Sequence, residues 1–97
     1  MKTLEEIREK INRVKPLLNK KYHTSNFLIF GSYARNEQKE DSDLDLLVEF
    51  DAPVDMFTFL DLEEELHQIL EIKIDLGTPE SLKTLVKDKI LKEALVI

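Results

Sequence analysis

The segment from Asp43 to Phe50 constrains the fold more than any other part of the chain, because its side chains alternate nearly as a strand requires. One side of this segment is apolar and the other is mostly polar. The apolar side has Leu44, Leu46, Val48 and Phe50, and the other has Asp43, Asp45, Leu47 and Glu49. The sequence therefore predicts a strand that is covered on one face and carries two carboxylates on the other.

Helical spacing of apolar residues predicts the helices. Thr3 and Glu6 form a capping-box pattern, and a helix is expected from about residue 3 to 18. A second helix is expected over about residues 55–70, where apolar positions recur among many acidic ones. Thr78 and Pro79 suit the start of a short helix. A last amphipathic helix is expected near the C-terminus, and the apolar end at residues 94–97 should pack on the core or in an interface.

Two further strands and a short helix complete the expected order of elements. Residues 27–30 form a continuous apolar run that stops at Gly31, which is typical of a strand covered on both sides. Residues 71–76 alternate again and place Asp75 on their polar side. A short helix is expected over residues 32–36. The sequence thus predicts an α/β (α+β) fold.

Size and charge limit the kinds of protein this chain can be. Its 97 residues suffice for one hydrophobic core, so residues 1–97 are expected to form a single domain. A net charge of -6 makes direct binding of nucleic acid a poor expectation. The absence of Cys fits a reducing compartment, and no segment resembles a signal peptide or a membrane span. We therefore expect a cytoplasmic protein without membrane contact.

Three aspartates are the candidate metal ligands. If the strands at 43–50 and 71–76 are neighbours, Asp43, Asp45 and Asp75 come close together and need a cation, and hard oxygen ligands suit Mg²⁺ or Mn²⁺. The alternative is that these aspartates serve only solubility and capping. An EF-hand calcium loop is excluded, because Leu46 stands where the loop needs Gly and Ala52 where it needs a bidentate Glu.

The turn that follows residue 30 is the candidate phosphate site. Gly31 permits close backbone approach, Ser32 adds a hydroxyl, and the N–H groups at a helix start favour an anion. Arg35 can pair with a phosphate, although an ion pair with Glu37 or Glu40 is the alternative. A Gly-Ser pair alone is a common turn, and no P-loop pattern follows it.

The combination of these motifs resembles a known family. The segments 31–35 (Gly-Ser-Tyr-Ala-Arg), 41–48 (Asp-Ser-Asp-Leu-Asp-Leu-Leu-Val) and 74–76 (Ile-Asp-Leu) resemble those of the minimal nucleotidyltransferases. These are the smallest members of the DNA polymerase beta superfamily. The resemblance is closest to the MNT antitoxins that accompany HEPN-domain toxins, and it covers nearly the whole chain.

This resemblance implies a nucleotidyltransferase fold, with a short mixed sheet of three to four strands flanked by helices. It implies that Gly31 and Ser32 contact nucleotide phosphate and that Asp43 and Asp45 bind Mg²⁺. It also implies that Asp75 completes the set of catalytic carboxylates. It also implies AMP transfer from ATP to a tyrosine hydroxyl of a partner HEPN ribonuclease toxin. The alternatives are an antitoxin that acts by binding alone, and a nucleotidyltransferase acting on RNA or a small molecule. Many family members have Gly where this chain has Asn36, a residue that tolerates the left-handed conformation.

Overall fold

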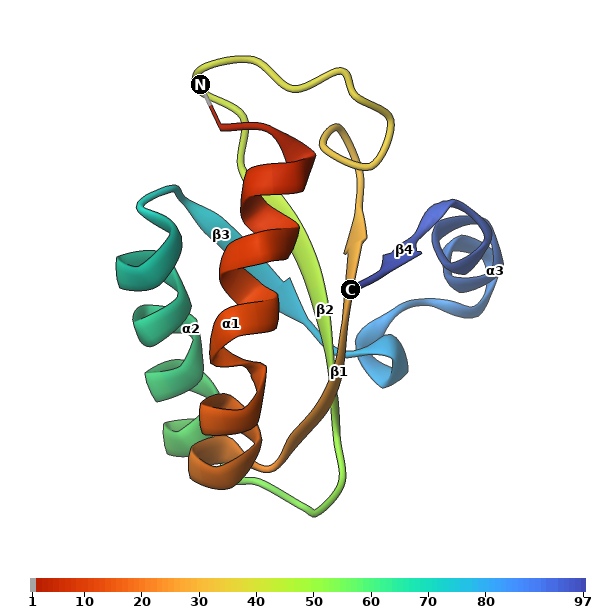
Figure 1. The fold of residues 1–97 in the computed structure, drawn as a ribbon. Helices are drawn as coiled ribbons and strands as arrows, with labels where there is room; N and C mark the ends of the chain where they lie inside the picture. Colours follow the sequence, from red (N-terminus) through yellow and green to blue (C-terminus); the bar gives the residue numbers. More distant parts are fainter. Residues whose placement is uncertain (1) are drawn as a thin grey trace.

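The computed structural model describes residues 2–97, in which a four-stranded sheet carries two long helices on one face (Figure 1). The helices and strands follow the chain in the order α1 (Leu4–Tyr22), β1 (Thr24–Phe30), β2 (Leu44–Phe50), α2 (Met56–Leu70), β3 (Ile74–Gly77), the 3-10 helix η1 (Pro79–Ser81), α3 (Thr84–Glu93) and β4 (Leu95–Val96). Helix α2 packs beside α1 over the β3 side of the sheet, and α3 lies beyond the opposite edge, next to β4 (Figure 1). The predicted α/β fold is confirmed.

The sheet is mixed, as the family resemblance implies. Its strands are ordered β3-β2-β1-β4. The β1–β2 and β1–β4 pairs are antiparallel, whereas β2 and β3 are parallel. A parallel pair needs a crossover connection, and α2 supplies it between β2 and β3. The two aspartate-bearing strands are therefore neighbours, which is the condition for bringing Asp43, Asp45 and Asp75 close together.

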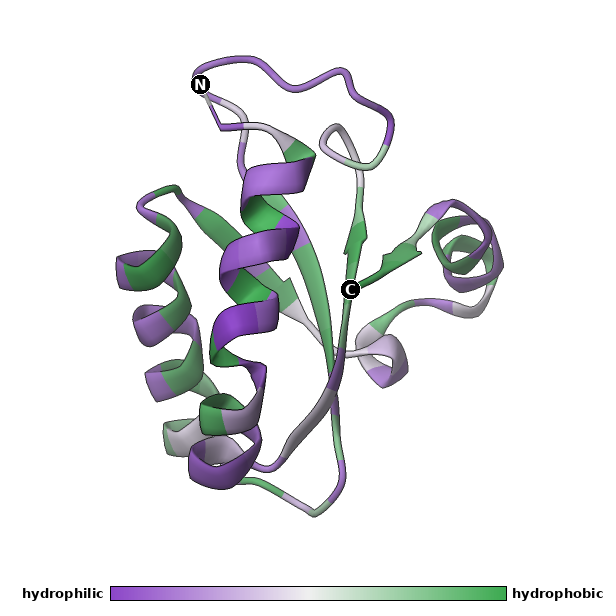
Figure 2. Ribbon diagram, in the orientation of Figure 1, coloured by the Kyte–Doolittle hydropathy of each residue, from purple (hydrophilic) through white to green (hydrophobic). Residues whose placement is uncertain are grey.

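The core lies between the sheet and the helices α1 and α2. The centre of this layer is made of fully buried apolar side chains, which are Ile7, Ile11, Leu18, Phe27, Ile29, Leu44, Leu46, Val48, Leu62, Leu66 and Leu70. Figure 2 shows the strands as hydrophobic and the loop between β1 and β2 as hydrophilic. This layer sets the register of β2, because slipping by one residue would exchange its apolar and acidic faces.

Helix α1 is one turn longer than predicted. Its N-cap is the expected one, since the Thr3 hydroxyl accepts a hydrogen bond of 3.2 Å from the Glu6 N–H. The helix continues past Pro16 because Tyr22, one turn after Leu18, is also buried on the same face. It ends at His23 in the left-handed conformation, with φ of 62°.

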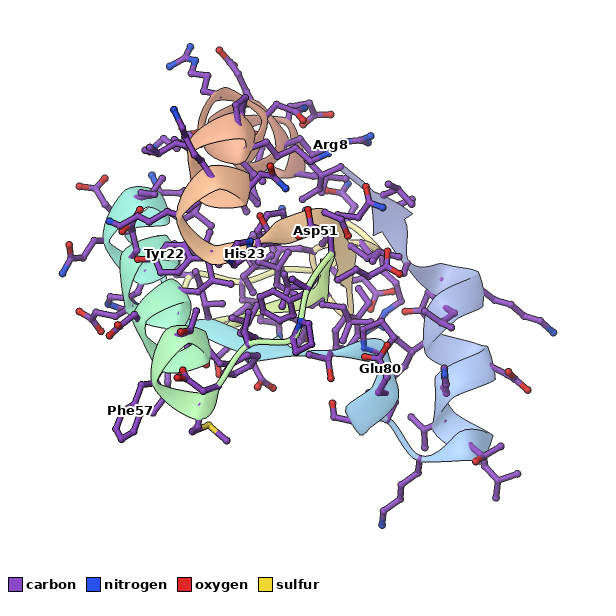
Figure 3. All side chains as sticks on the ribbon, turned by 90° about the horizontal axis from the view of Figure 1, so that it is seen from below. Arg8, Tyr22, His23, Asp51, Phe57 and Glu80 are labelled. Carbon is purple, nitrogen blue, oxygen red and sulfur yellow. The ribbon has the colours of Figure 1, made fainter. Side chains whose placement is uncertain are left out.

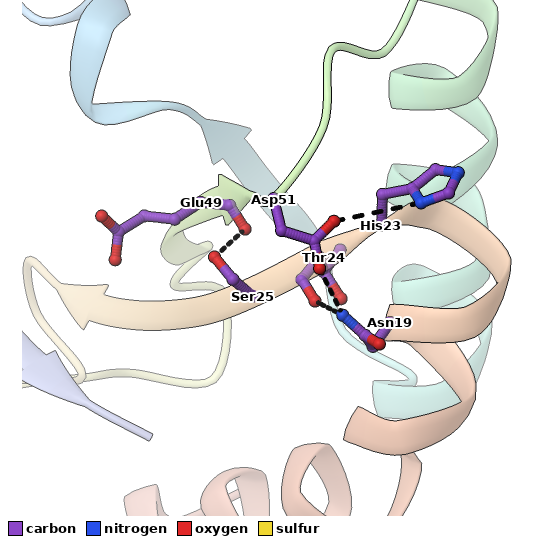
Figure 4. A network of polar contacts seen from close by, with 6 residues as sticks. All are labelled: Asn19, His23, Thr24, Ser25, Glu49 and Asp51. Carbon is purple, nitrogen blue, oxygen red and sulfur yellow. Dashed lines mark hydrogen bonds and ion pairs between the residues drawn. The ribbon is translucent and has the colours of Figure 1, made fainter.

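A polar network fixes the passage from α1 to β1 against the end of β2 (Figure 4). The Asn19 amide donates hydrogen bonds of 2.5 Å to the Thr24 carbonyl and 2.9 Å to the Asp51 carboxylate. The Asp51 N–H donates to the His23 carbonyl at 2.8 Å. Strand β1 begins at Thr24, three residues earlier than predicted, because this network and pairing with Phe50 hold it.

The C-terminal part differs from the prediction. The short helix expected at Pro79 is present as η1, but none of the residues of α3 is buried. Leu85 is 92% exposed, so the apolar pattern of this helix is not matched by packing within the chain. The last residues form strand β4, which was not predicted and pairs with β1. Among residues 2–97, no helix has both the length and the apolar character that crossing a membrane requires.

The contact between α1 and α2 yields a prediction about acid stability. Glu65 accepts hydrogen bonds from Lys21 at 2.6 Å and from the Tyr22 hydroxyl at 2.7 Å, and the Lys21 hydrogen bond, followed by that of Tyr22, lowers the Glu65 pKa. A lowered carboxylate pKa adds stability above the pKa of the unfolded chain, and this stability is lost as the pH falls through the folded value. We expect Glu65→Gln to lower the free energy of unfolding by roughly 1 kcal/mol at pH 7.

The measurement is urea unfolding of both proteins between pH 7 and pH 3. The difference between them should shrink towards zero below the ordinary glutamate pKa of 4.5. Glu64→Gln is the control, because it removes the same charge from an exposed position of the same helix. A difference for Glu65→Gln that persists unchanged at pH 3 would contradict the prediction.

Candidate active site

The segment after β1 is a series of turns that bends the chain back on itself. Gly31 has φ of 73°, a left-handed conformation that Gly adopts at little cost. The Arg35 N–H donates to the Gly31 carbonyl at 3.2 Å, and the Glu37 N–H donates to the Ser32 carbonyl at 2.8 Å. The predicted helix over residues 32–36 is wrong, because the chain turns here without continuing as a helix. Asn36 has φ of 58°, so the expectation that it tolerates the left-handed conformation is confirmed.

The three aspartates come from two neighbouring strands. Asp43 directly precedes β2, Asp45 lies in β2, and the parallel register places Asp45 opposite Asp75 of β3. Residues paired in this way point to the same face of the sheet. Asp75 is exposed and Asp45 is half-buried. The fold therefore brings two of the predicted ligands side by side and the third two residues away.

The charge balance around Asp45 is unfavourable. Burial raises the Asp45 pKa, and the charges of Asp75 and then Asp43 raise it further, while Arg35 opposes them. The three carboxylates lie on one face without an adequate counter-charge. A divalent cation bound between them would relieve their mutual repulsion. The chemistry of these three donors thus fits Mg²⁺ or Mn²⁺.

The side chains do not yet form a closed metal cage. Within residues 2–97, no three or more His, Asp or Glu side chains are arranged to hold a metal ion. The proximity of these three aspartates is set by the backbone register. Magnesium sites commonly use only one or two carboxylates and take their remaining oxygens from water and substrate phosphates. The observed geometry fits a site of that open kind.

Gly31 connects the turn to the carboxylates. A Cβ atom at this position would lie 2.1 Å from Asp45 Oδ2 and 3.0 Å from Asp45 Cγ. The antiparallel register explains this closeness, because Phe30, the residue before Gly31, is paired with Asp45. Any group that binds the backbone of the Gly31 turn therefore lies beside the Asp45 carboxylate.

Arg35 is held by two acidic side chains. Its Nη1 group lies 2.5 Å from Glu93 at the end of α3, and its Nε group lies 3.4 Å from Glu37. The Glu37 pair matches one of the predicted ion pairs, whereas the Glu93 contact joins residues too far apart in sequence to be predicted. The pKa of Arg35 is raised, chiefly by the Glu93 hydrogen bond. Since a guanidinium has five N–H donors, others remain for an anion.

Tyr33 is a core residue that the sequence does not reveal. It follows the Gly-Ser pair, where its sequence position would allow stacking on a base, yet only 2% of its surface is exposed. Its burial raises the pKa of its hydroxyl. Tyr33 therefore anchors the turn to the core and is not available for stacking on a nucleotide base. His23 and His67, for which no metal role is expected, are both exposed.

Comparison with known proteins agrees with this geometry. The family model for polymerase beta nucleotidyltransferases matches residues 12–97. A Methanocaldococcus jannaschii protein, MJ0126, provisionally named a protein adenylyltransferase, is 43% identical over 96 residues, which cover 99% of this chain and 98% of the relative. The protein adenylyltransferase MntA of Thermococcus cleftensis is 37% identical over 97 residues, which cover 100% and 98% of the two chains.

Solved structures share the same fold. One provisionally described as a minimal nucleotidyltransferase has a TM-score of 0.83 and 31% identity, covering 97% of this chain and 95% of that one. A toxin–antitoxin structure with AMP-PNP has a TM-score of 0.71 and 23% identity, covering 88% and 69%. A complex of tri-AMPylated Shewanella oneidensis HEPN toxin with MNT antitoxin has a TM-score of 0.65 and 20% identity, covering 93% and 70%. The chain therefore belongs to the polymerase beta nucleotidyltransferase family, and within it to the relatives of the MntA protein adenylyltransferases.

Proposed function

We propose that this chain transfers AMP from ATP to a tyrosine hydroxyl of a HEPN-domain ribonuclease toxin and thereby acts as its antitoxin. The observation that carries the proposal is the register of β2 against β3, which pairs Asp45 with Asp75 beside the Gly31 turn. The names of the relatives support transfer of AMP to protein. The toxin complexes that share the fold support a HEPN partner.

Each proposed site residue has a distinct task. Asp43, Asp45 and Asp75 would hold Mg²⁺ or Mn²⁺, which when bound neutralises phosphate charge and lowers the pKa of an attacking hydroxyl. The backbone of Gly31 and the Ser32 hydroxyl would bind the triphosphate, and Arg35 would pair with one of its phosphates. Catalysis would then consist mainly of positioning and of charge stabilisation.

The proposed reaction is a single displacement at the α-phosphorus of ATP. A bond forms between the tyrosine oxygen and the α-phosphorus, and the bond from that phosphorus to the bridging oxygen of the β-phosphate breaks. Pyrophosphate leaves with the bonding electrons. The exposed Asp75 is the proposed acceptor of the tyrosine proton, because it can be reached from solvent whereas Asp45 is half-buried. We propose that ATP is the nucleotide substrate. We also propose that residues 1–97 form one domain and that this domain is cytoplasmic.

A labelling experiment tests this proposal. The purified chain is incubated with Mg²⁺, ATP and a purified HEPN-domain toxin. Label from α-³²P-ATP should appear on a tyrosine of the HEPN protein, and EDTA should prevent it. Label from γ-³²P-ATP should not appear, because the γ-phosphate leaves with pyrophosphate. Labelling by the γ-phosphate, or of RNA without the HEPN protein, would contradict the proposal.

A second candidate is an antitoxin that neutralises its toxin by binding alone. It is favoured by one observation, the large apolar side chains exposed at the start of α2, with Phe57 79% exposed. In that case the chain would inhibit the ribonuclease at equimolar amounts without ATP, and no label would be transferred. RNA as the acceptor is disfavoured by the net charge of -6.

A further inference from the structure

A cavity of about 580 Å³ lies beside the C-terminal ends of β2 and β3. It is enclosed by the ends of β2 and β3, the start of α2 and η1, and none of the proposed site residues lines it. Phe50, Phe59 and Leu76 form apolar walls, while Asp55 and Glu80 stand among the polar lining residues. The rings of Phe50 and Phe59 pack against each other at a centroid distance of 6.5 Å, so they form one continuous apolar wall.

Three large apolar side chains are exposed on the first turns of α2, the helix whose first residue, Met56, lines the cavity. Met56, Phe57 and Leu60 of α2 have exposed fractions of 67%, 79% and 48%, and Met56 also lines the cavity. Figure 3, seen from below, shows Phe57 pointing away from the core and Glu80 on the other side of the region, at η1. Neighbouring exposed apolar groups of this size mark a binding surface more often than scattered ones do. We call these three residues and the cavity the α2 surface.

The charge around the α2 surface indicates what can bind there. Residues 55–65, which are the N-cap and first turns of α2, contain five Asp and Glu residues and no Lys or Arg. Asp61 and Glu64 follow Phe57 and Leu60 by four positions, so they continue the same side of α2. A second copy of this chain would bring the same negative charge against it, and nucleic acid or an anionic membrane would be repelled. The complementary occupant is a cationic protein segment with large apolar side chains.

The α2 surface is also separate from the nucleotide site. Asp45 and Phe50 are five residues apart on β2, which corresponds to about 17 Å along an extended strand. On β3 the cavity-lining Leu76 directly follows Asp75, but the two side chains point to opposite faces of the sheet, so a partner in the cavity lies on the other face from the Asp75 carboxylate. Binding of the partner and transfer of AMP can thus be separated by substitution.

We propose that the α2 surface binds a cationic amphipathic segment of the partner protein, with an apolar side chain in the cavity and Lys or Arg residues facing Asp55, Asp61 and Glu80. The inference rests on the proposed function only for the identity of this partner, which is the HEPN-domain toxin. Aromatic residues such as Phe57 that become buried in an interface commonly contribute much of its affinity. The acidic groups should raise the association rate of a cationic partner and make that rate depend on the salt concentration.

Affinity measurements with a purified HEPN-domain toxin, one that the wild-type chain labels with AMP where transfer occurs, test the proposal. Phe57→Ser should weaken binding about tenfold or more, because it removes an exposed anchor without disturbing the core. The matched control is Leu85→Ser, which removes an equally exposed apolar side chain from α3, and it should change the affinity less than about twofold. Asp61→Asn should weaken binding and reduce its dependence on NaCl concentration.

The outcomes separate this inference from the proposed activity. The double variant Asp43→Asn with Asp45→Asn should bind the HEPN protein like the wild type, so binding remains measurable even if no AMP transfer exists. Equal affinities of the Phe57→Ser and Leu85→Ser variants would overturn the inference, as would failure of the wild type to bind. Light scattering of the chain alone gives a further outcome: a wild-type dimer that Phe57→Ser dissociates would assign the surface to a second copy and overturn it.

Discussion

Replacing Asp43 and Asp45 together by Asn should lower AMP transfer by about 10³-fold or more while the domain stays folded. The amide has the shape of the carboxylate but not its charge, so it cannot hold a divalent cation against a triphosphate. Removing one ligand group is expected to cost several kcal/mol in the transition state, and each 1.36 kcal/mol is a factor of ten in rate. The measurement is the initial rate of label transfer from α-³²P-ATP to the HEPN protein.

Thermal unfolding provides the companion measurement for this double variant. Asp45 is half-buried among like charges that raise its pKa, so its neutralisation should leave the melting temperature unchanged or raise it. Glu49→Gln is the control, because Glu49 is an exposed carboxylate of the same strand four residues further on. It should retain the wild-type rate. A double variant that is folded and still active would show that the aspartates are not the metal ligands.

Gly31→Ala should damage activity more than stability. The left-handed backbone at Gly31 costs an alanine about 1–2 kcal/mol, which a domain of ordinary stability survives. The new Cβ would also meet Asp45 Oδ2 at 2.1 Å and Asp45 Cγ at 3.0 Å. Rotating the carboxylate alone does not move Cγ, so the whole Asp45 side chain must turn away. We expect a loss of about 10²-fold in AMP transfer, the size associated with a displacement of about 1 Å.

Gly77→Ala is the matched control for this substitution. Gly77 lies in β3, and a Cβ there would meet Ser81 Oγ at 3.5 Å and Leu47 Cδ2 at 3.6 Å, which are ordinary contacts. We expect wild-type rates and a change in unfolding free energy below about 1 kcal/mol. If Gly31→Ala kept the wild-type rate, the close relation between the turn and Asp45 would have no role in the reaction. Chemical denaturation of both variants measures the stability part.

Much of the fold follows from local sequence patterns. The alternation in residues 43–50 predicts β2, and the apolar spacing in residues 55–70 predicts α2, because burying one face of each element is a local requirement. The N-cap at Thr3 and the start of η1 at Pro79 are likewise local and are confirmed. The missed features are those whose stabilising contacts lie elsewhere in the chain. Strand β4 exists through pairing with β1, and Tyr33 is buried by distant side chains.

The candidate site also has residues that the sequence predicts and contacts that only the folded structure reveals. Residue types and spacing single out Gly31, Asp43, Asp45 and Asp75, because phosphate and divalent cations require backbone donors and hard oxygen ligands. The contact of Arg35 with Glu93 could not be predicted, since 58 positions separate the two residues. Likewise, the exposure of Phe57 and the cavity lined by Met56 are visible only when β2, α2 and η1 are placed together.

The chain's own order of residues is enough to specify the chemical groups and the secondary structure that presents them, because hydrogen bonding and amphipathic burial act over a few neighbouring positions. Packing of α1 and α2 on one face of the sheet decides the rest. It aligns Asp45 with Asp75, brings Asp45 against Gly31 and leaves the α2 surface open. These arrangements depend on strand order and register, which arise only when distant segments share one core.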